Sequence, residues 1–274
     1  MTASADASPG FEDVMIGLGL LAGTANVIMQ LARPGVGHGV VESKVDSGNV
    51  LLHPVKRGRT TLTYLAVATL GTPEEKALFR RGVDRAHAQV RSDASSPVEY
   101  NAFDPELQLW VAACLYRGVE DVCRTLGRPL GDDEAEHLYR ESAVLGTTLQ
   151  VKPEMWPSDR AAFEEYWTAS LDKIAIDDVV RDYLTRLAGM KNLPRVLSVP
   201  FGPLGTFVTT GFLPQRFRDE MRLRWTEKQQ RRFDRLMALT AACVAILPPV
   251  LRKFPYNLML WDLRRRIKAG KPLV

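Results

Sequence analysis

The chain has 274 residues, of which 46% are apolar and 25% are charged, and its formal net charge is +4. These values are those of a globular protein with a sizeable core, and they exclude collagen-like, low-complexity and disulfide-rich chains. No basic region precedes the first apolar run, so a secretory signal is not predicted. The three cysteines form no CxxC pair, which fits a reducing compartment, and we therefore expect a cytoplasmic protein.

The N-terminal residues 1–10 are polar and are expected to be disordered, whereas residues 11–274 are expected to form one domain. The apolar run Val14–Ala32 is long enough to raise the question of a membrane span. Polar residues and glycines interrupt it. We therefore interpret this run as a buried helix.

A glycine-rich stretch follows at residues 32–39, and its composition predicts a loop rather than a helix. His38 lies in this stretch, and Glu42 comes shortly after it. A carboxylate or an imidazole in such a loop can move protons beside a reacting group, provided that burial raises the carboxylate pKa. The alternative for Glu42 is an exposed loop carboxylate without a chemical role.

Residues 60–71 fit both a strand and a helix, because their threonines, tyrosine and valine favour a strand whereas their leucines and alanines permit a helix. We predict a helix, since the surrounding chain offers no partner strands. Arg57 and Thr61 then lie one turn apart on the same face. The guanidinium of Arg57 could bind a carboxylate through two hydrogen bonds, or it could form an ordinary surface salt bridge.

The next predicted helix has clear start signals, because Thr72 is a good N-cap, Pro73 fits the first helical position and Glu75 completes a capping box. Apolar residues then recur at helical spacing on the face that carries His87. On the residues alone, a core histidine hydrogen-bonded to a carbonyl is the simpler interpretation. An iron-ligand role for His87 needs support from outside this pattern.

A further helix is predicted to begin at Asp104, which is followed by a proline and an acidic residue. Trp110 lies beside its apolar stripe and could line a cofactor pocket, although core packing is the simpler role. Cys114 lies on the stripe itself. A thiolate ligand at Cys114 is conceivable, and a buried, inert thiol is the interpretation that we favour.

Capping residues and apolar periodicity predict additional helices at 132–145, 158–172, 177–188, 215–224 and 226–247. Glycine and proline clusters, such as the one at 198–203, are expected to separate helices. Strand-like alternation is rare, and no glycine-rich nucleotide-binding motif occurs. We therefore predict an all-α fold, a single-domain helical bundle.

Positive charge is concentrated in the last quarter of the chain. Residues 216–274 hold fifteen Lys or Arg and five Asp or Glu, a net charge of +10, so the remaining residues carry −6. This asymmetry suggests peripheral contact with an anionic membrane surface, although a solvated helix face is the interpretation that we favour. Acidic residues interleave with the arginines and no DNA-reading module occurs, so a nucleic-acid partner is not predicted.

An ordered set of motifs in this chain resembles a known family. The set consists of Arg57-x-x-x-Thr61, Gly71, His87, Tyr100-x-Ala-x-Asp-Pro-Glu106, Trp110-Val111, Pro214-x-x-Phe217-Arg218, Trp225-Thr-x-x-Gln229 and Leu247-Pro-x-x-x-Arg252-x-x-Pro255. It covers most of the chain and is similar to the family of the latex clearing protein (rubber oxygenase) and the mycophenolic-acid-type oxygenase. The resemblance implies a helical core of globin-like arrangement that binds haem b.

The resemblance also implies roles for single residues. His87 matches the histidine that binds the haem iron, Arg57 and Thr61 match residues beside the haem, and Glu42 falls roughly where the family has a catalytic glutamate. The implied function is a haem-dependent oxygenase that acts on a small hydrophobic, isoprenoid-like substrate with O2. The alternatives are a haem carrier or sensor without turnover, and a cofactor-free helical protein that handles lipids or binds partners.

Two positions depart from the family pattern. The glycines that commonly follow the haem histidine are absent from residues 90–97, and Ala112 stands where many relatives have a histidine. Haem binding through His87 does not depend on either position. The departures concern the distal side of the haem and the choice of substrate.

Overall fold

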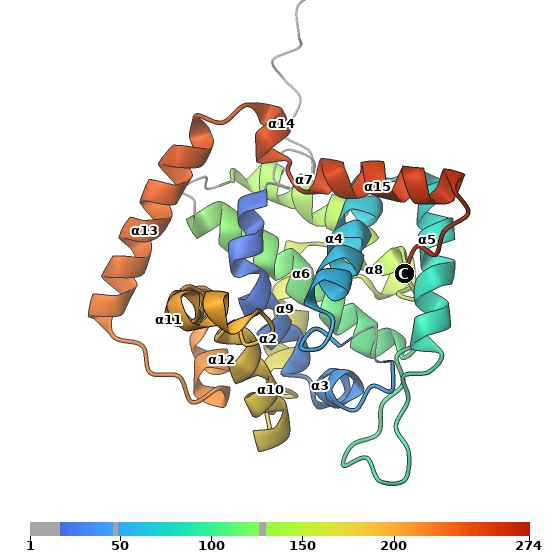
Figure 1. Cartoon of the computed structure of the whole chain (residues 1–274), viewed down its shortest axis with the longest axis horizontal. Coiled ribbons are helices and arrows are strands. Elements are labelled where there is room, and N and C mark those ends of the chain that lie inside the picture. Colours follow the sequence, from blue (N-terminus) through green and yellow to red (C-terminus); the bar gives the residue numbers. More distant parts are fainter. Residues whose placement is uncertain (1–16, 46–48, 126–129) are drawn as a thin grey trace, which may run out of the picture.

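The structure is a computed structural model that describes residues 17–45, 49–125 and 130–274 (Figure 1), and the predicted disorder of residues 1–10 lies outside them. In the described ranges the only extended pairing is an isolated antiparallel bridge between Arg91 and Asn101. The predicted all-α fold is confirmed. The elements are η1 Gly17–Ala22, α2 Gly23–Leu31, α3 Pro34–Val41, α4 Pro54–Leu70, α5 Pro73–His87, α6 Pro105–Thr125, α7 Asp132–Ser142, α8 Val144–Thr147, η3 Pro153–Met155, α9 Arg160–Leu171, α10 Asp178–Ala188, α11 Arg195–Phe212, α12 Gln215–Glu220, α13 Glu227–Ala245, α14 Pro249–Arg252 and α15 Tyr256–Lys268.

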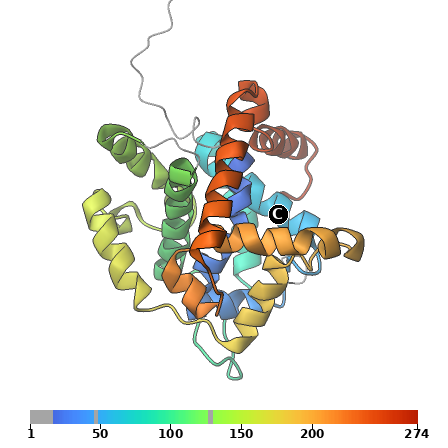
Figure 2. The ribbon, with the colours of Figure 1, turned by 90° about the vertical axis from the view of Figure 1, so that its left-hand side faces the viewer.

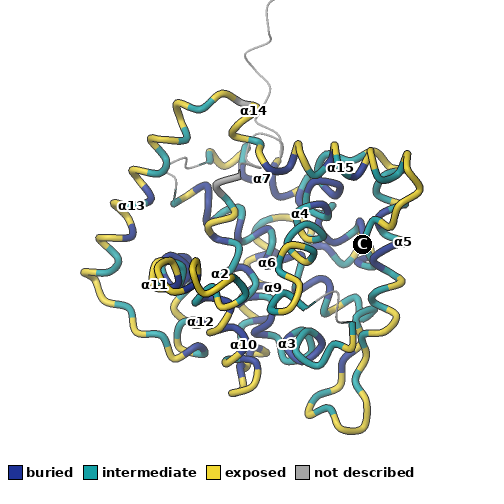
Figure 3. The backbone as a smooth tube through the Cα atoms, in the orientation of Figure 1, coloured by how far each residue is buried: buried dark blue, intermediate teal, exposed yellow. Residues whose placement is uncertain are grey.

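Helices α2 and α6 run through the centre of the molecule, and most of the other helices pack around them (Figures 1 and 2). Two long-range hydrogen bonds join the pair: the Asn26 side-chain amide donates to the Cys114 carbonyl at 2.6 Å, and Trp110 Nε1 donates to the Gln30 carbonyl at 3.0 Å. Figure 3 shows that the tube is darkest along these central helices, where the side chains are buried. Burial of this apolar surface is the main stabilising term of the fold.

Helices α4 and α5 are consecutive and pack against each other; the predicted start of α5 at Thr72 and Pro73 is confirmed, whereas α4 begins at Pro54, six residues before the predicted stretch 60–71. Thr72 accepts a hydrogen bond from the Glu75 amide, and the Glu75 side chain accepts one from the Thr72 amide, so the capping box is present. Gly71 joins the two helices, and a Cβ there would lie 2.5 Å from the Val67 carbonyl oxygen. Helix α4 also packs against α8 and α15. Its first turns and the end of α5 are therefore fixed with respect to each other.

The prediction of a loop at residues 32–39 was wrong, because helix α3 spans Pro34–Val41. The chain does break at Arg33, whose backbone is extended, and Pro34 then starts the new helix. Its glycines allow close packing: a Cβ on Gly37 would lie 2.6 Å from the Leu31 carbonyl oxygen and 3.2 Å from Val180. Tertiary contact thus outweighs the low helix propensity of glycine.

The C-terminal half also differs from the prediction. Helix α11 continues through Pro200 and Pro203, where an interruption was predicted. It packs so closely on the end of α10 that a Cβ on Gly202 would lie 2.7 Å from the Gly189 oxygen. Helix α12 ends at Glu220 and not at residue 224, because Arg222 adopts a left-handed backbone conformation. Helix α15 was not predicted at all.

Candidate functional site

His87 is the last residue of α5, and its imidazole has no hydrogen-bond partner among the residues that the structure describes. The Nδ1 atom is buried, and neither ring nitrogen hydrogen-bonds to a residue in the described part of the chain. Desolvation lowers the pKa of the imidazole, the positive charge of Arg57 lowers it further, and Asp84 opposes this shift. A neutral imidazole with a free nitrogen is the form that binds metal ions. The core role in which His87 bonds to a carbonyl is therefore not seen.

Arg57 lies in the first turn of α4, and its guanidinium has no acidic partner in the described part of the chain. Its side chain is exposed by surface area, yet the surrounding protein desolvates the guanidinium and lowers its pKa, an effect that Tyr183 partly offsets. The Arg57 side chain thus keeps some contact with water although many protein atoms lie around its guanidinium. No salt bridge joins Arg57 to any acidic residue that the structure describes. A desolvated, unpaired guanidinium favours the binding of an anionic ligand.

Thr61 follows Arg57 by one helical turn and is exposed. Threonines in helices commonly donate their hydroxyl to the carbonyl four residues earlier, and neighbouring Thr60 does so to Lys56 at 3.0 Å. No such bond forms at Thr61 within the described residues. Its hydroxyl can therefore bond to a ligand at the same helix face as Arg57.

Two aromatic residues at this site were missed by the sequence analysis. The Phe103 ring meets the His87 ring edge-on, with 6.2 Å between centroids and an interplanar angle of 77°. Tyr183 of α10 is buried close enough to Arg57 for each to shift the pKa of the other. Phe103 stands at an unspecified position of the Tyr100 motif, which was the one available signal. Nothing in the local sequence placed Tyr183 beside α4.

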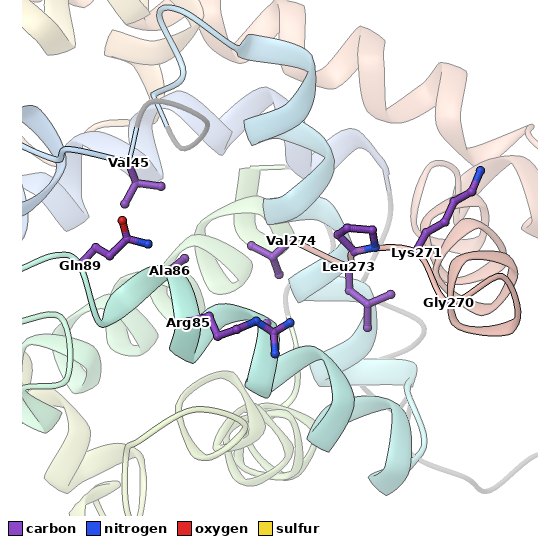
Figure 4. A pocket seen from close by; sticks show the side chains of 10 residues that line it. Val45, Arg85, Ala86, Gln89, Gly270, Lys271, Leu273 and Val274 are labelled. Carbon is purple, nitrogen blue, oxygen red and sulfur yellow. The ribbon is translucent and has the colours of Figure 1, made fainter.

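Helix α5 also borders a hollow of about 510 Å³, a size typical of small-molecule sites. Figure 4 shows Arg85 and Ala86 of α5 around it, with Gln89 from the turn after α5 and Leu273 and Val274 from the end of the chain. A second hollow, of about 630 Å³, lies between the residues after α3 and those after α5. His87 lines neither hollow, although its neighbour Ala86 lines the first.

Glu42, the predicted proton-handling residue, belongs to a different cluster, which we call the α3 cluster and which consists of His38, Glu42, Ser96, Tyr100 and Asp177. His38 is buried, and its Nδ1 and Nε2 lie 2.6 Å from carboxylate oxygens of Glu42 and Asp177, respectively. The Ser96 and Tyr100 hydroxyls donate to the other Glu42 oxygen at 2.7 and 2.9 Å. Each oxygen of Glu42 therefore has a partner.

The bonds of the α3 cluster set the ionisation of its carboxylates. Burial alone would raise the pKa of Glu42, but the hydrogen bonds from Ser96, His38 and Tyr100 outweigh it, so the pKa is lowered. The pKa of Asp177 is lowered in the same way, against desolvation, by backbone amides and His38. Glu42 is thus ionised at neutral pH and is not an exposed loop carboxylate. Its hydrogen-bond partners do not include Arg57 or His87.

The remaining predicted positions lie in the core. Trp110 is fully buried and stacks on Trp167 at 5.2 Å, so any part that it takes in a cofactor pocket stays a prediction. Ala112 is buried against Gly146, where a Cβ would lie 3.1 Å from that of Ala112, which leaves no room for an imidazole. Burial raises the pKa of the Cys114 thiol well above its ordinary value, which favours the inert state.

Two general features complete the description. In residues 17–45, 49–125 and 130–274, no three His, Cys, Asp or Glu side chains gather into a group that could hold a metal ion. A haem iron asks less of the protein, since one axial histidine suffices. None of the helices in these ranges combines the length and the apolar character needed to cross a membrane.

Comparison with known proteins gives a consistent answer. The family described as ER-bound oxygenase mpaB/B'/rubber oxygenase, catalytic domain, matches residues 14–265. The chain is 54% identical over 255 residues to the uncharacterized proteins Mb2261 of Mycobacterium bovis and Rv2237 of Mycobacterium tuberculosis, which covers 93% of this chain and the whole of each relative. No solved structure matches it. The chain therefore belongs to the mpaB and rubber oxygenase catalytic-domain family, an oxygenase family, as its motifs predicted.

Proposed function

We propose that this protein is a haem-b-dependent oxygenase that acts on a hydrophobic substrate, with His87 as the iron ligand. The observation that carries the proposal is the shared lack of partners at His87, Arg57 and Thr61 within the described part of the chain. Folded proteins rarely leave a buried nitrogen unbonded or a desolvated cation unpaired, because each costs free energy. A ligand that carries both a metal and an anionic group would satisfy them together.

Haem b has the groups that these residues lack. The neutral imidazole of His87 can bind iron, the guanidinium of Arg57 can donate two hydrogen bonds to a propionate, and the Thr61 hydroxyl can add another. The Phe103 ring packs against the His87 ring in a T-shaped contact. These residues therefore fit the group in charge, protonation state and donor type.

Bound haem would supply the iron at which O2 reacts, while the protein supplies orientation and electrostatics. A second histidine ligand is disfavoured, because both nitrogens of His38 are committed to carboxylates and Ala112 leaves no room for an imidazole. The lack of a histidine ligand from either of these positions favours an oxygenase over a carrier that would use one of them together with His87. Glu42 is ionised, so it could accept a proton but has none to donate. To accept one it would have to give up a hydrogen bond from His38, Ser96 or Tyr100.

The substrate class is also a proposal. Apolar side chains of Leu273 and Val274 lie at the hollow beside α5, where an isoprenoid-like chain could pack. We place the protein in a reducing compartment such as the cytoplasm, where a buried thiol like that of Cys114 stays reduced.

The test of the cofactor is an absorption spectrum of the purified full chain, before and after addition of haem b. We expect a Soret band that forms at one haem per chain. A chain that never takes up haem would leave the third interpretation, a cofactor-free lipid-handling or interaction protein. Haem uptake without oxygen or peroxide turnover would instead favour the carrier or sensor.

The test of the reaction is oxygen consumption by the haem-loaded chain with polyprenoids and simple alkenes. We expect uptake with at least one of these apolar substrates. Glu42→Gln removes the charge of Glu42 and nearly keeps its shape, so it separates a chemical from a structural role. If this variant binds haem normally and turns over as fast as the unmodified chain, Glu42 takes no part in catalysis.

A further inference from the structure

The connection between α13 and α15 exposes an unusual set of large apolar side chains. Six of them make up what we call the α13–α15 edge: Ile246, Val250, Leu251, Phe254, Leu258 and Trp261. Their exposed fractions run from 42% for Leu258 to 84% for Ile246, in a stretch of only sixteen residues. A cluster of this kind on a soluble surface marks an interaction site.

The local sequence explains why the edge protrudes. Helix α13 ends at Ala245, shortly before Pro248, and the short helix α14, which starts at Pro249, then turns the chain into α15. Figures 1 and 2 both show α14 and the adjoining end of α13 at the outer margin of the molecule, beyond the central helices. The exposed side chains therefore belong to a segment that lies at the margin of the molecule.

Helix α15 divides its residues between the protein and this edge. Its buried face, with Tyr256, Leu260 and Leu263, packs against the rest of the molecule, and α4 is its main neighbour. Its outer face carries Leu258 and Trp261. Packing of α15 against α4, the helix that carries Arg57, therefore holds the α13–α15 edge in place.

Positive charge surrounds the apolar residues. From residue 239 to residue 274 the chain holds seven Lys or Arg and one Asp, a net charge of +6. The single acid, Asp262, is paired with Arg265 at 3.0 Å, and the guanidinium of Arg265 also lies over the Trp261 ring, 5.2 Å from its centroid. Lys268 and Lys271 follow on exposed positions. Apolar side chains with adjacent cations are complementary to an anionic lipid surface.

We propose that the α13–α15 edge docks the protein on the surface of a membrane that contains anionic lipids. Trp261, Phe254 and their apolar neighbours enter the interface between headgroups and acyl chains, and the lysines after Trp261 meet the lipid phosphates. The contact is peripheral, and it is independent of the proposed haem. The net positive charge of residues 239–274 favours an anionic lipid surface over a second copy of this chain, which would bring the same positive charge to the contact.

The test is co-sedimentation of the full chain with phosphatidylcholine vesicles that either contain or lack phosphatidylglycerol. We expect binding to the anionic vesicles that weakens as salt is raised. The double variant Leu251→Ser, Trp261→Ser should bind roughly tenfold more weakly or worse, because two inserted side chains are lost. Lys268→Gln with Lys271→Gln should weaken binding by roughly tenfold on anionic vesicles only.

A matched control comes from α11, where Phe201 is 51% exposed, against 53% for Phe254. Phe254→Ser should weaken vesicle binding, and Phe201→Ser should leave it unchanged; circular dichroism checks that each variant is folded. An equal loss of vesicle binding in the two variants would overturn the proposal. Failure of the unmodified chain to bind anionic vesicles would also overturn it. A chain that elutes as a dimer, and becomes a monomer in the Leu251→Ser, Trp261→Ser variant, would assign the edge to a second copy instead.

Discussion

The α4–α5 site and the α3 cluster contain the same kinds of polar side chain, but they differ in how these are satisfied. His38 has a carboxylate 2.6 Å from each ring nitrogen, whereas His87 has no hydrogen bond from either nitrogen to a described residue. Glu42 accepts three hydrogen bonds, whereas the cation Arg57 has no acidic partner in the same ranges. Both regions join segments that are distant in sequence.

The difference separates residues that hold the fold together from residues that are available to a ligand. A satisfied network such as the α3 cluster ties α3 to the segment after α5 and to the start of α10, and it leaves no donor or acceptor free. An unsatisfied set costs free energy unless something binds to it. Sequence analysis assigned both Glu42 and His87 to one haem site, and only the hydrogen bonding distinguishes them.

The largest expected effect comes from exchanging the two histidines for alanine one at a time. His87→Ala should lose the Soret band of the haem-loaded chain or change its spin state, because the iron ligand is removed. His38→Ala should keep the band. His137, which is exposed near Glu141, provides the control, and His137→Ala should leave the spectrum unchanged. An unaltered spectrum in His87→Ala would move the ligand to His53 or His137.

Stability should respond in the opposite way to the spectrum, with a larger effect at His38 than at His87. His38→Gln should lower the free energy of unfolding by roughly 1.5–3 kcal/mol, because a charged hydrogen-bond network in a buried position is broken. His87→Ala should change the stability of the haem-free chain by less, since no bond is lost. Urea denaturation of the haem-free variants measures both. Equal losses in the two variants would contradict the division into a structural and a ligand-binding region.

The α3 cluster also predicts the sign of a pH effect. The folded-state pKa of Glu42 is lowered from 4.5 and that of Asp177 from 3.8, so each carboxylate binds its proton more weakly in the folded chain than in the unfolded one. Their contribution to stability is therefore present at neutral pH and is lost as the pH falls below about 4.5. Between pH 7 and pH 3.5, His38→Gln should lose less stability than the unmodified chain. Denaturation curves at the two pH values measure this difference.

The sequence predicted the starts of helices correctly where the residues that determine them are close together in the chain. The capping box of Thr72 and Glu75 and the N-cap at Asp104 involve residues three apart or fewer, and both are present in the structure. The errors arose from contacts across the fold. Gly37 and Gly202 disfavour a helix locally, but they permit a close approach to Leu31 and Gly189 that no local pattern reveals.

The candidate site was predictable in part for the same reason. Helical spacing placed Arg57 and Thr61 on one face, and family resemblance supplied the role of His87. The partner of His38 could not be found in this way, because Asp177 is 139 residues away in the chain. Tyr183 is also brought to Arg57 by packing alone, and a buried aromatic on an amphipathic helix is equally compatible with the core.

A smaller effect is expected at Arg57. Arg57→Ala should weaken haem retention by roughly 1–3 kcal/mol, or about 5- to 150-fold, because a propionate would lose its charged donor. The stability of the haem-free chain should stay the same or rise, since an unpaired, desolvated cation is removed. Haem transfer to an acceptor protein measures the first quantity and urea denaturation the second. Arg81→Ala on the exposed side of α5 is the control, and an equal loss of haem there would argue that Arg57 acts only through surface charge.

The smallest expected effect comes from Thr61, and it is the most specific test of the site. Thr61→Val replaces a hydroxyl by a methyl group of similar shape, and no hydrogen bond to a described residue is lost. The haem-free chain should therefore unfold at the same urea concentration, while haem retention falls by about 0.5–1.5 kcal/mol, the net value of one hydrogen bond. Thr60→Val is the neighbouring control, because the Thr60 hydroxyl bonds to the Lys56 carbonyl at 3.0 Å and so faces its own helix. If Thr60→Val weakens haem retention as much as Thr61→Val does, the loss comes from the helix and not from a hydroxyl that faces the ligand.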